Sequence, residues 1–147
     1  MVVKNKGMKK MYVFYVSEFH LEMILLPFVN KKIEENENII IKTEYDLKET
    51  LQVLLSKMNL KKENKEKILK LNWNKNDEKN ISDKSNVIIV GDKKYIDNVN
   101  DQIAEKNFGN ITILDCYKLE EIKDNMNNIV SKYDCNLNTS GINIQKN

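Results

Sequence analysis

Four short groups of polar residues follow the apolar runs of this sequence, and they contain the side chains best suited to chemistry. The groups are Ser17, Glu18 and His20; Thr43 and Glu44; Gly91 and Asp92; and Asp115 and Cys116. If each apolar run is a strand of an open parallel sheet, its carboxyl end is where such sheets bind their ligands. We therefore expect the ligand-binding site to lie among these nine residues.

The first group admits two interpretations. His20 is the only histidine and the only side chain that titrates near neutral pH without help, so it could act as an acid or base beside Ser17 and Glu18. The same residues are typical of a helix start, because serine caps free amides and glutamate suits the positive end of the helix dipole. We favour the second interpretation, with Ser17 as a cap and His20 on the rim of the sheet.

Asp92 and Cys116 each admit a structural and a functional interpretation. Asp92 directly precedes an amphipathic stretch, so we interpret it as a helix cap rather than as a ligand-binding carboxylate. Cys116 follows an apolar run but has no second cysteine near it in sequence, so we interpret it as a buried structural thiol.

The two cysteines also bear on the compartment. We expect Cys116 and Cys135 near opposite ends of one helix, more than about 20 Å apart at 1.5 Å per residue. That separation is too large for a disulfide. Two reduced thiols predict a cytoplasmic protein.

Several familiar motifs are missing from the sequence. It contains neither G-x-G-x-x-G nor G-x-x-x-x-G-K-[ST], so dinucleotide and P-loop binding are not indicated. His20-x-Glu22 resembles half of a zinc deaminase signature, but the P-C-x-x-C half is absent. One histidine and two distant cysteines do not make a usual structural zinc site. We predict no metal site and assign no cofactor.

Composition narrows the choice of partners. The chain has 24 lysines and no arginine, together with 22 asparagines and 17 isoleucines, a bias typical of an AT-rich genome. Because bidentate recognition of phosphate and guanine favours arginine, nucleic-acid binding is disfavoured. The most lysine-rich stretch, residues 57–70, is interrupted by Glu63 and Glu66 and is interpreted as a solvated helix face. No apolar run approaches the length of a membrane span.

The elements that must position these groups are clearest from Ser85 to Lys118. Val87 to Val90 is a short apolar run typical of a strand buried on both faces. A helical stripe that includes Ile96, Val99 and Ile103 follows, and then a second apolar run, Ile111 to Leu114. This pattern predicts a right-handed βαβ unit.

The remaining chain repeats the alternation. We expect strands at Met11–Val16 and 38–43, helices after each, and a last helix from Leu119 to Tyr133. Asp46 and Glu49 resemble a capping box for the second helix. Pro27 either kinks the first helix or starts a shorter one.

The predicted fold is α/β: a small Rossmann-like or flavodoxin-like three-layer sandwich with about four parallel strands. One domain spans residues 11–134 and carries an inserted helix and loop at 59–85, between strands two and three. Residues 1–10 are expected to be disordered, and residues 135–147 to form a loose tail. A 2-1-3-4 strand order would place Ser17, Glu18 and His20 near Gly91 and Asp92; a 3-2-1-4 order would bring Asp115 and Cys116 in instead.

Three functions are compatible with these observations. The first is a non-enzymatic module that binds a small anionic ligand or a protein partner and has a regulatory role; strand two or the first helix could mediate a homodimer. The second is a small enzyme acting on a polar or phosphorylated metabolite. The third is a sensor of a nucleotide second messenger, since the βα rhythm resembles in outline the ligand-sensing Rossmann-like domains of bacterial defence systems. The first is preferred because no complete catalytic constellation is visible.

Overall fold

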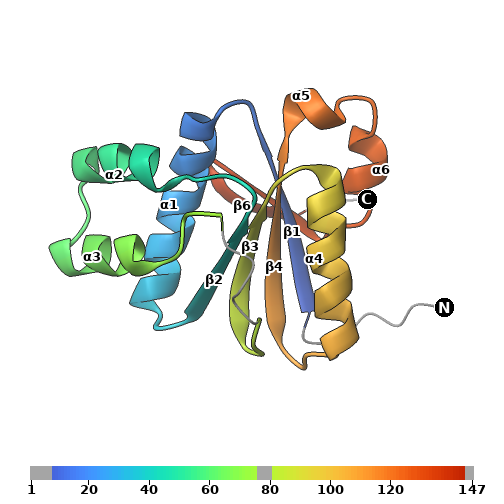
Figure 1. Cartoon of the computed structure of the whole chain (residues 1–147), viewed down its shortest axis with the longest axis horizontal. Coiled ribbons are helices and arrows are strands. Elements are labelled where there is room, and N and C mark those ends of the chain that lie inside the picture. The colour runs from blue at the N-terminus through green and yellow to red at the C-terminus, as the bar shows by residue number, and fades with distance from the viewer. Residues whose placement is uncertain (1–7, 76–80, 145–147) are drawn as a thin grey trace.

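The computed structural model describes residues 8–75 and 81–144, and in this part of the chain six strands form one sheet (Figure 1). The sheet order is β2-β3-β4-β1-β5-β6. The strands are β1 (Met8–Tyr15), β2 (Asn38–Thr43), β3 (Ser85–Val90), β4 (Ile111–Lys118), β5 (Cys135–Asn138) and β6 (Gly141–Ile144). Parallel pairs link the first five positions, and β6 pairs antiparallel with β5. The predicted α/β class is confirmed.

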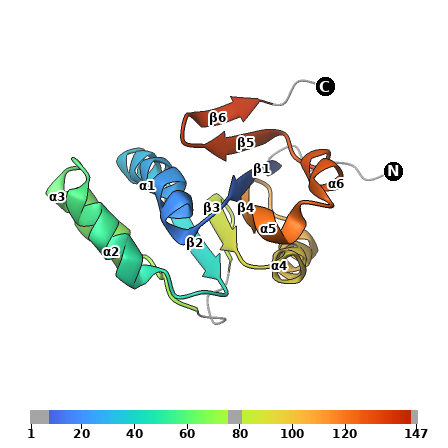
Figure 2. The same ribbon diagram turned by 90° about the horizontal axis from the view of Figure 1, so that it is seen from above.

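Helices cover both faces of the sheet, as the view from above shows (Figure 2). One face carries α1 (Glu18–Glu34), α2 (Lys48–Lys57) and α3 (Lys62–Lys70); the other carries α4 (Lys93–Lys106), α5 (Leu119–Ile122) and α6 (Met126–Val130). Side chains alternate between the faces along each strand. In β1, for example, Val13 packs toward α1, whereas Tyr12 packs on the opposite side.

The strand order differs from both orders considered for the sequence. The chain leaves β1, passes along α1 and enters β2 at the far edge, which leaves room for β3 and β4 between them. As a result β1 lies between β4 and β5, and β4 separates it from β3. The 2-1-3-4 alternative, in which the residues after β1 meet those after β3, is therefore wrong, and so is the 3-2-1-4 order.

Residues 8–10 and 135–144 contain more structure than predicted. β1 begins at Met8, so the expectation of disorder is wrong for residues 8–10; residues 1–7 lie outside the described part. The supposed tail forms the β5–β6 hairpin, with Cys135 and Leu137 buried on the α1 face. Gly141 adopts φ of 102°, a conformation that favours glycine, where the hairpin turns.

The helices differ from the predictions at three points. α1 is one 17-residue helix that contains Pro27 with an exposed side chain, so the alternative of a shorter helix starting at Pro27 is wrong. The expected last helix is two short helices, α5 and α6. The capping box is absent, because Leu47 occupies the N-cap of α2 and Asp46 Oδ1 instead accepts a hydrogen bond from the Lys75 amide at 2.9 Å.

The predicted inserted helix is α3, which forms a hairpin with α2 over α1. Trp73, the single tryptophan of the chain, is fully buried after α3 and donates from Nε1 to the Ile68 carbonyl at 2.7 Å. The Trp73 carbonyl accepts from the Leu47 amide at 2.8 Å. These two bonds tie the end of the hairpin to its beginning and fix α2 in place.

Replacing Trp73 by Phe is expected to lower the free energy of unfolding by about 1–3 kcal/mol, because the Ile68 carbonyl loses the shorter of its two hydrogen bonds and the smaller ring leaves a cavity in the core. Urea denaturation followed by circular dichroism measures this change. The exposed aromatic Phe19 offers a control, since Phe19→Leu should change stability by less than about 0.5 kcal/mol. Equal midpoints for both variants would contradict this account of the hairpin.

Candidate functional site

The group after β1 starts α1. Ser17 Oγ accepts from the His20 amide at 3.2 Å, which confirms Ser17 as the cap. The His20 ring turns back, and its Nδ1 accepts from the Val16 amide at 3.0 Å. Nδ1 of His20 is therefore used in a hydrogen bond that orders the backbone before α1.

The groups after β2 and β3 lie side by side, because these strands are neighbours. Glu44 Oε1 accepts from the Asp92 amide at 2.7 Å, and Asp92 Oδ1 accepts from the Tyr95 amide at 2.8 Å, which confirms Asp92 as the cap of α4. The Thr43 hydroxyl bonds both the amide and the carbonyl of Tyr45. These polar atoms hold the turns at the ends of the strands.

Gly91 makes the contact between the two turns possible. A Cβ at this position would lie 2.6 Å from Glu44 Oε1 and 2.6 Å from Tyr95 Cδ2. Such distances are far below van der Waals contact, so any side chain at position 91 must push Glu44 away from the Asp92 amide.

We expect Gly91→Ala to lower the free energy of unfolding by about 1–3 kcal/mol through this overcrowding. Gly109→Ala is the matched control, because a Cβ there would meet Asp83 Oδ2 at an ordinary 3.6 Å. Chemical denaturation of both variants tests the difference. A cost at position 109 as large as that at position 91 would argue against the crowding explanation.

Asp115 and Cys116 lie within β4 rather than after it, so their predicted place at the carboxyl end is wrong. The strand continues to Lys118, and both side chains are fully buried on opposite faces. Burial raises the pKa of the Cys116 thiol, in agreement with the interpretation as a structural thiol.

The two cysteines are not at the ends of one helix, as had been predicted. Cys116 pairs with Val13 of β1, and Cys135 of β5 pairs with Met11. Both are buried and free. With one strand between them and a two-residue offset along it, they are about 12 Å apart, still beyond the reach of a disulfide.

Asp115 is the centre of a polar network on the α4 face. Tyr133 donates to its Oδ2 at 2.5 Å, and Asn100 Nδ2 of α4 lies 3.0 and 3.1 Å from its two oxygens. The Tyr117 hydroxyl bonds that of Tyr133 at 2.6 Å, and Lys10 Nζ lies 3.9 Å from Oδ2. Despite these partners, burial raises the pKa of Asp115 above its usual range.

The raised pKa of Asp115 predicts the sign of a pH effect. The folded protein holds this proton more tightly than the unfolded chain, so stability falls as the pH rises from about 4 through the folded-state pKa. The slope contributed by one such group approaches about 1.4 kcal/mol per pH unit. Asp115→Asn should make the decline shallower, as measured by urea denaturation across a pH series.

A control carboxylate is available on the same helix as Asn100. Asp101→Asn removes an exposed group of α4 and should keep the wild-type slope. Parallel stability curves for the wild type and Asp115→Asn would contradict a tightly held proton at Asp115.

A groove near the carboxyl end of β1 lies between the start of α1 and α2. Its volume is about 640 Å³. The lining residues are Val16, Ser17, Glu18, Phe19, Glu22, Thr50, Val53, Leu54, Lys57 and Lys118. Val16, Phe19 and Val53 are 61%, 58% and 56% exposed, so the rim presents apolar side chains to solvent. We call it the α1–α2 groove.

A buried carboxyl group lines this groove. Glu22 is 1% exposed, and its Oε2 accepts from the Thr50 hydroxyl at 2.6 Å. Its Oε1 is buried and has no hydrogen-bond partner among the described residues. Burial raises the pKa of Glu22, the Thr50 hydrogen bond lowers it, and the nearby Glu18 carboxylate raises it. Burying such an oxygen without a donor is costly.

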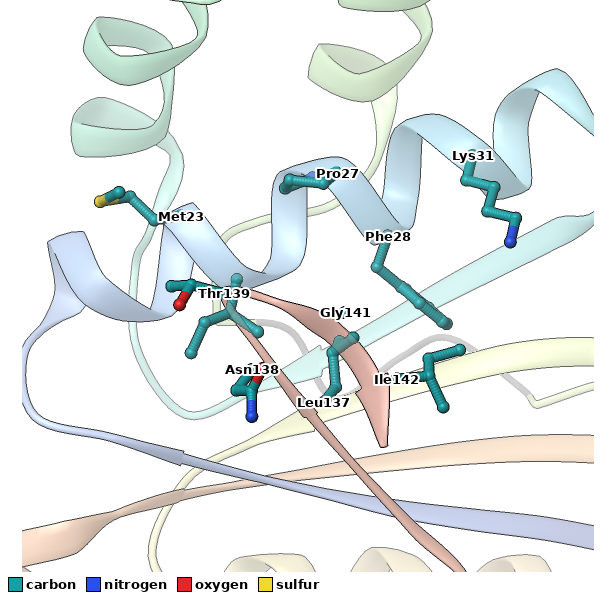
Figure 3. A pocket seen from close by; sticks show the side chains of 10 residues that line it. Met23, Pro27, Phe28, Lys31, Leu137, Asn138, Thr139, Gly141 and Ile142 are labelled. Carbon is teal, nitrogen blue, oxygen red and sulfur yellow. The ribbon is translucent and has the colours of Figure 1, made fainter. Parts of the chain in front are cut away.

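A second groove, of about 360 Å³, lies between α1 and the β5–β6 hairpin (Figure 3). Side chains of α1, such as Met23 and Phe28, face Leu137 and Ile142 of the hairpin across it. Among the described residues that line it, none has a buried polar atom without a partner. It therefore lacks the polar feature that distinguishes the α1–α2 groove.

The structure thus brings the predicted residues together only in part. Glu44, Gly91 and Asp92 meet, and Ser17 and Glu18 line the α1–α2 groove, whereas Asp115 belongs to a separate network. Sequence reasoning missed the central residues of the groove, Glu22 and Thr50. The available signal was a glutamate placed directly beside the apolar stripe of α1, next to Leu21 and Ile24.

Within residues 8–75 and 81–144, no group of three or more His, Cys, Asp or Glu side chains is placed to hold a metal ion. None of the helices in the same residues has the length and apolar character needed to cross a bilayer. Comparison of the chain with protein-family models, with curated proteins and with solved structures gives no match.

Proposed function

We propose that this chain is a non-enzymatic, Rossmann-like regulatory module that binds a small molecule in the α1–α2 groove. The observation that carries the proposal is the combination of an exposed apolar rim with the buried, unpartnered Oε1 of Glu22. Small-molecule sites are mostly apolar and contain a few polar groups that orient the ligand. A groove of about 640 Å³ has the size of such a site.

The roles of the other polar residues support binding over catalysis. Ser17 and Asp92 cap helices, Glu44 holds the Asp92 amide, and His20 Nδ1 accepts from the backbone. A small enzyme acting on a polar or phosphorylated metabolite is less well supported, because the groove walls are mainly apolar. The same apolar lining argues against a nucleotide second messenger as the ligand.

A pair of variants on α2 tests the site. Val53→Glu places a charge on the apolar wall of the groove, whereas Gln52→Glu adds the same charge to the neighbouring exposed position outside it. Small aromatic alcohols, amines and acids are titrated into isotope-labelled protein, and amide shifts are recorded by NMR. We expect shifts around Phe19 and Thr50 in the wild type and in Gln52→Glu, and at least a tenfold weaker affinity in Val53→Glu, about 1.4 kcal/mol.

Two outcomes would overturn the proposal. The first is an absence of shifts at the groove with every compound. The second is equal affinity in Val53→Glu and Gln52→Glu, since the binding site would then lie elsewhere on the molecule.

A further inference from the structure

Two glutamates, Glu18 and Glu22, line the α1–α2 groove. Glu22 is held by one hydrogen bond from Thr50, and its second oxygen is buried without a donor among the described residues. Glu18, one turn earlier on α1, is the charged neighbour that acts on Glu22, and it carries the same sign. A ligand group beside Glu22 therefore meets two carboxyl groups, those of Glu18 and Glu22.

Two lysines also line the groove. Lys57 is the last residue of α2, and Lys118 is the last residue of β4. Neither lysine forms an ion pair with Glu22 in the described part of the chain. Within residues 8–75 and 81–144, the Glu22 carboxyl group therefore has no ion-pair partner.

We propose that the ligand of this groove is an amine with an apolar body, whose ammonium group donates to Glu22 Oε1 while the body lies on Phe19 and Val53. This inference rests on the proposed function and specifies its ligand class. It replaces the small anionic ligand considered for the sequence, because an anion beside Glu22 would face two carboxyl groups, those of Glu18 and Glu22.

The chemistry of the polar end can be isolated with three compounds of nearly the same shape. An ammonium supplies both a donor and the opposite charge, and such charge-assisted hydrogen bonds are roughly twice as strong as neutral ones. An alcohol supplies the donor alone, and a carboxylate is repelled. For 2-phenylethylamine, 2-phenylethanol and phenylacetate we expect affinity to fall in that order, with about a tenfold preference for the amine over the alcohol.

The titrations use the full chain at neutral pH, and affinities are taken from amide shifts at the groove. Glu22→Gln keeps the shape of the side chain and removes its charge, so it should reduce the preference for the amine to less than about twofold. Glu49→Gln is the matched control, because it removes an exposed carboxylate of α2 that does not line this groove. It should keep the wild-type preference.

The outcomes separate the two proposals. Equal binding of amine and alcohol by the wild type, or tighter binding of phenylacetate, overturns the amine inference and leaves the groove as a ligand site. The same holds if Glu22→Gln keeps the full amine preference. No shift at the groove with any of the three compounds overturns both. The wild-type ranking alone decides the matter if Glu22→Gln does not fold.

Discussion

The buried carboxyl group of Asp115 is the interaction on which the arrangement of this sheet depends. Its partners come from α4 through Asn100, from the segment before β5 through Tyr133, and from β1 through Lys10. Leaving such a group unsatisfied in the core would be costly, so these elements must come together around β4. The network thereby fixes β1 beside β4 and directs the chain after α6 into the position of β5, on the other side of β1.

That arrangement explains why the candidate site lies on helices and not on strand ends. With β4 between β1 and β3, the polar residues after these strands do not converge, and each group orders its own turn or helix start. On the opposite face α1 contacts β1 and β2, and α2 packs against it. Their contact brings Thr50 to Glu22 across 28 positions of sequence and forms the groove beside it.

Local patterns predicted local structure well. The periodicity of apolar residues located β2, β3 and α4, and the residue types at 17 and 92 identified two caps that the structure confirms. Strand order was not predictable in this way, because it depends on contacts between distant segments. β5 was missed because Cys-Asn-Leu-Asn is short and half polar, although its alternation suits a strand. Glu22 was missed because a glutamate on a helix normally faces water, and only the packing of α2 buries it.

The hairpin at the end of the sheet has a consequence for how the molecule behaves in concentrated solution. β6 is the outermost strand on that side, and only four residues long, with Ile142 and Ile144 exposed. An edge strand presents main-chain donors and acceptors that can recruit another extended chain, and short edges are one way in which proteins limit this hazard. Because the chain turns back at Gly141, the parallel sheet ends in a short antiparallel strand. This strand offers few main-chain donors and acceptors with which a misfolded neighbour could pair.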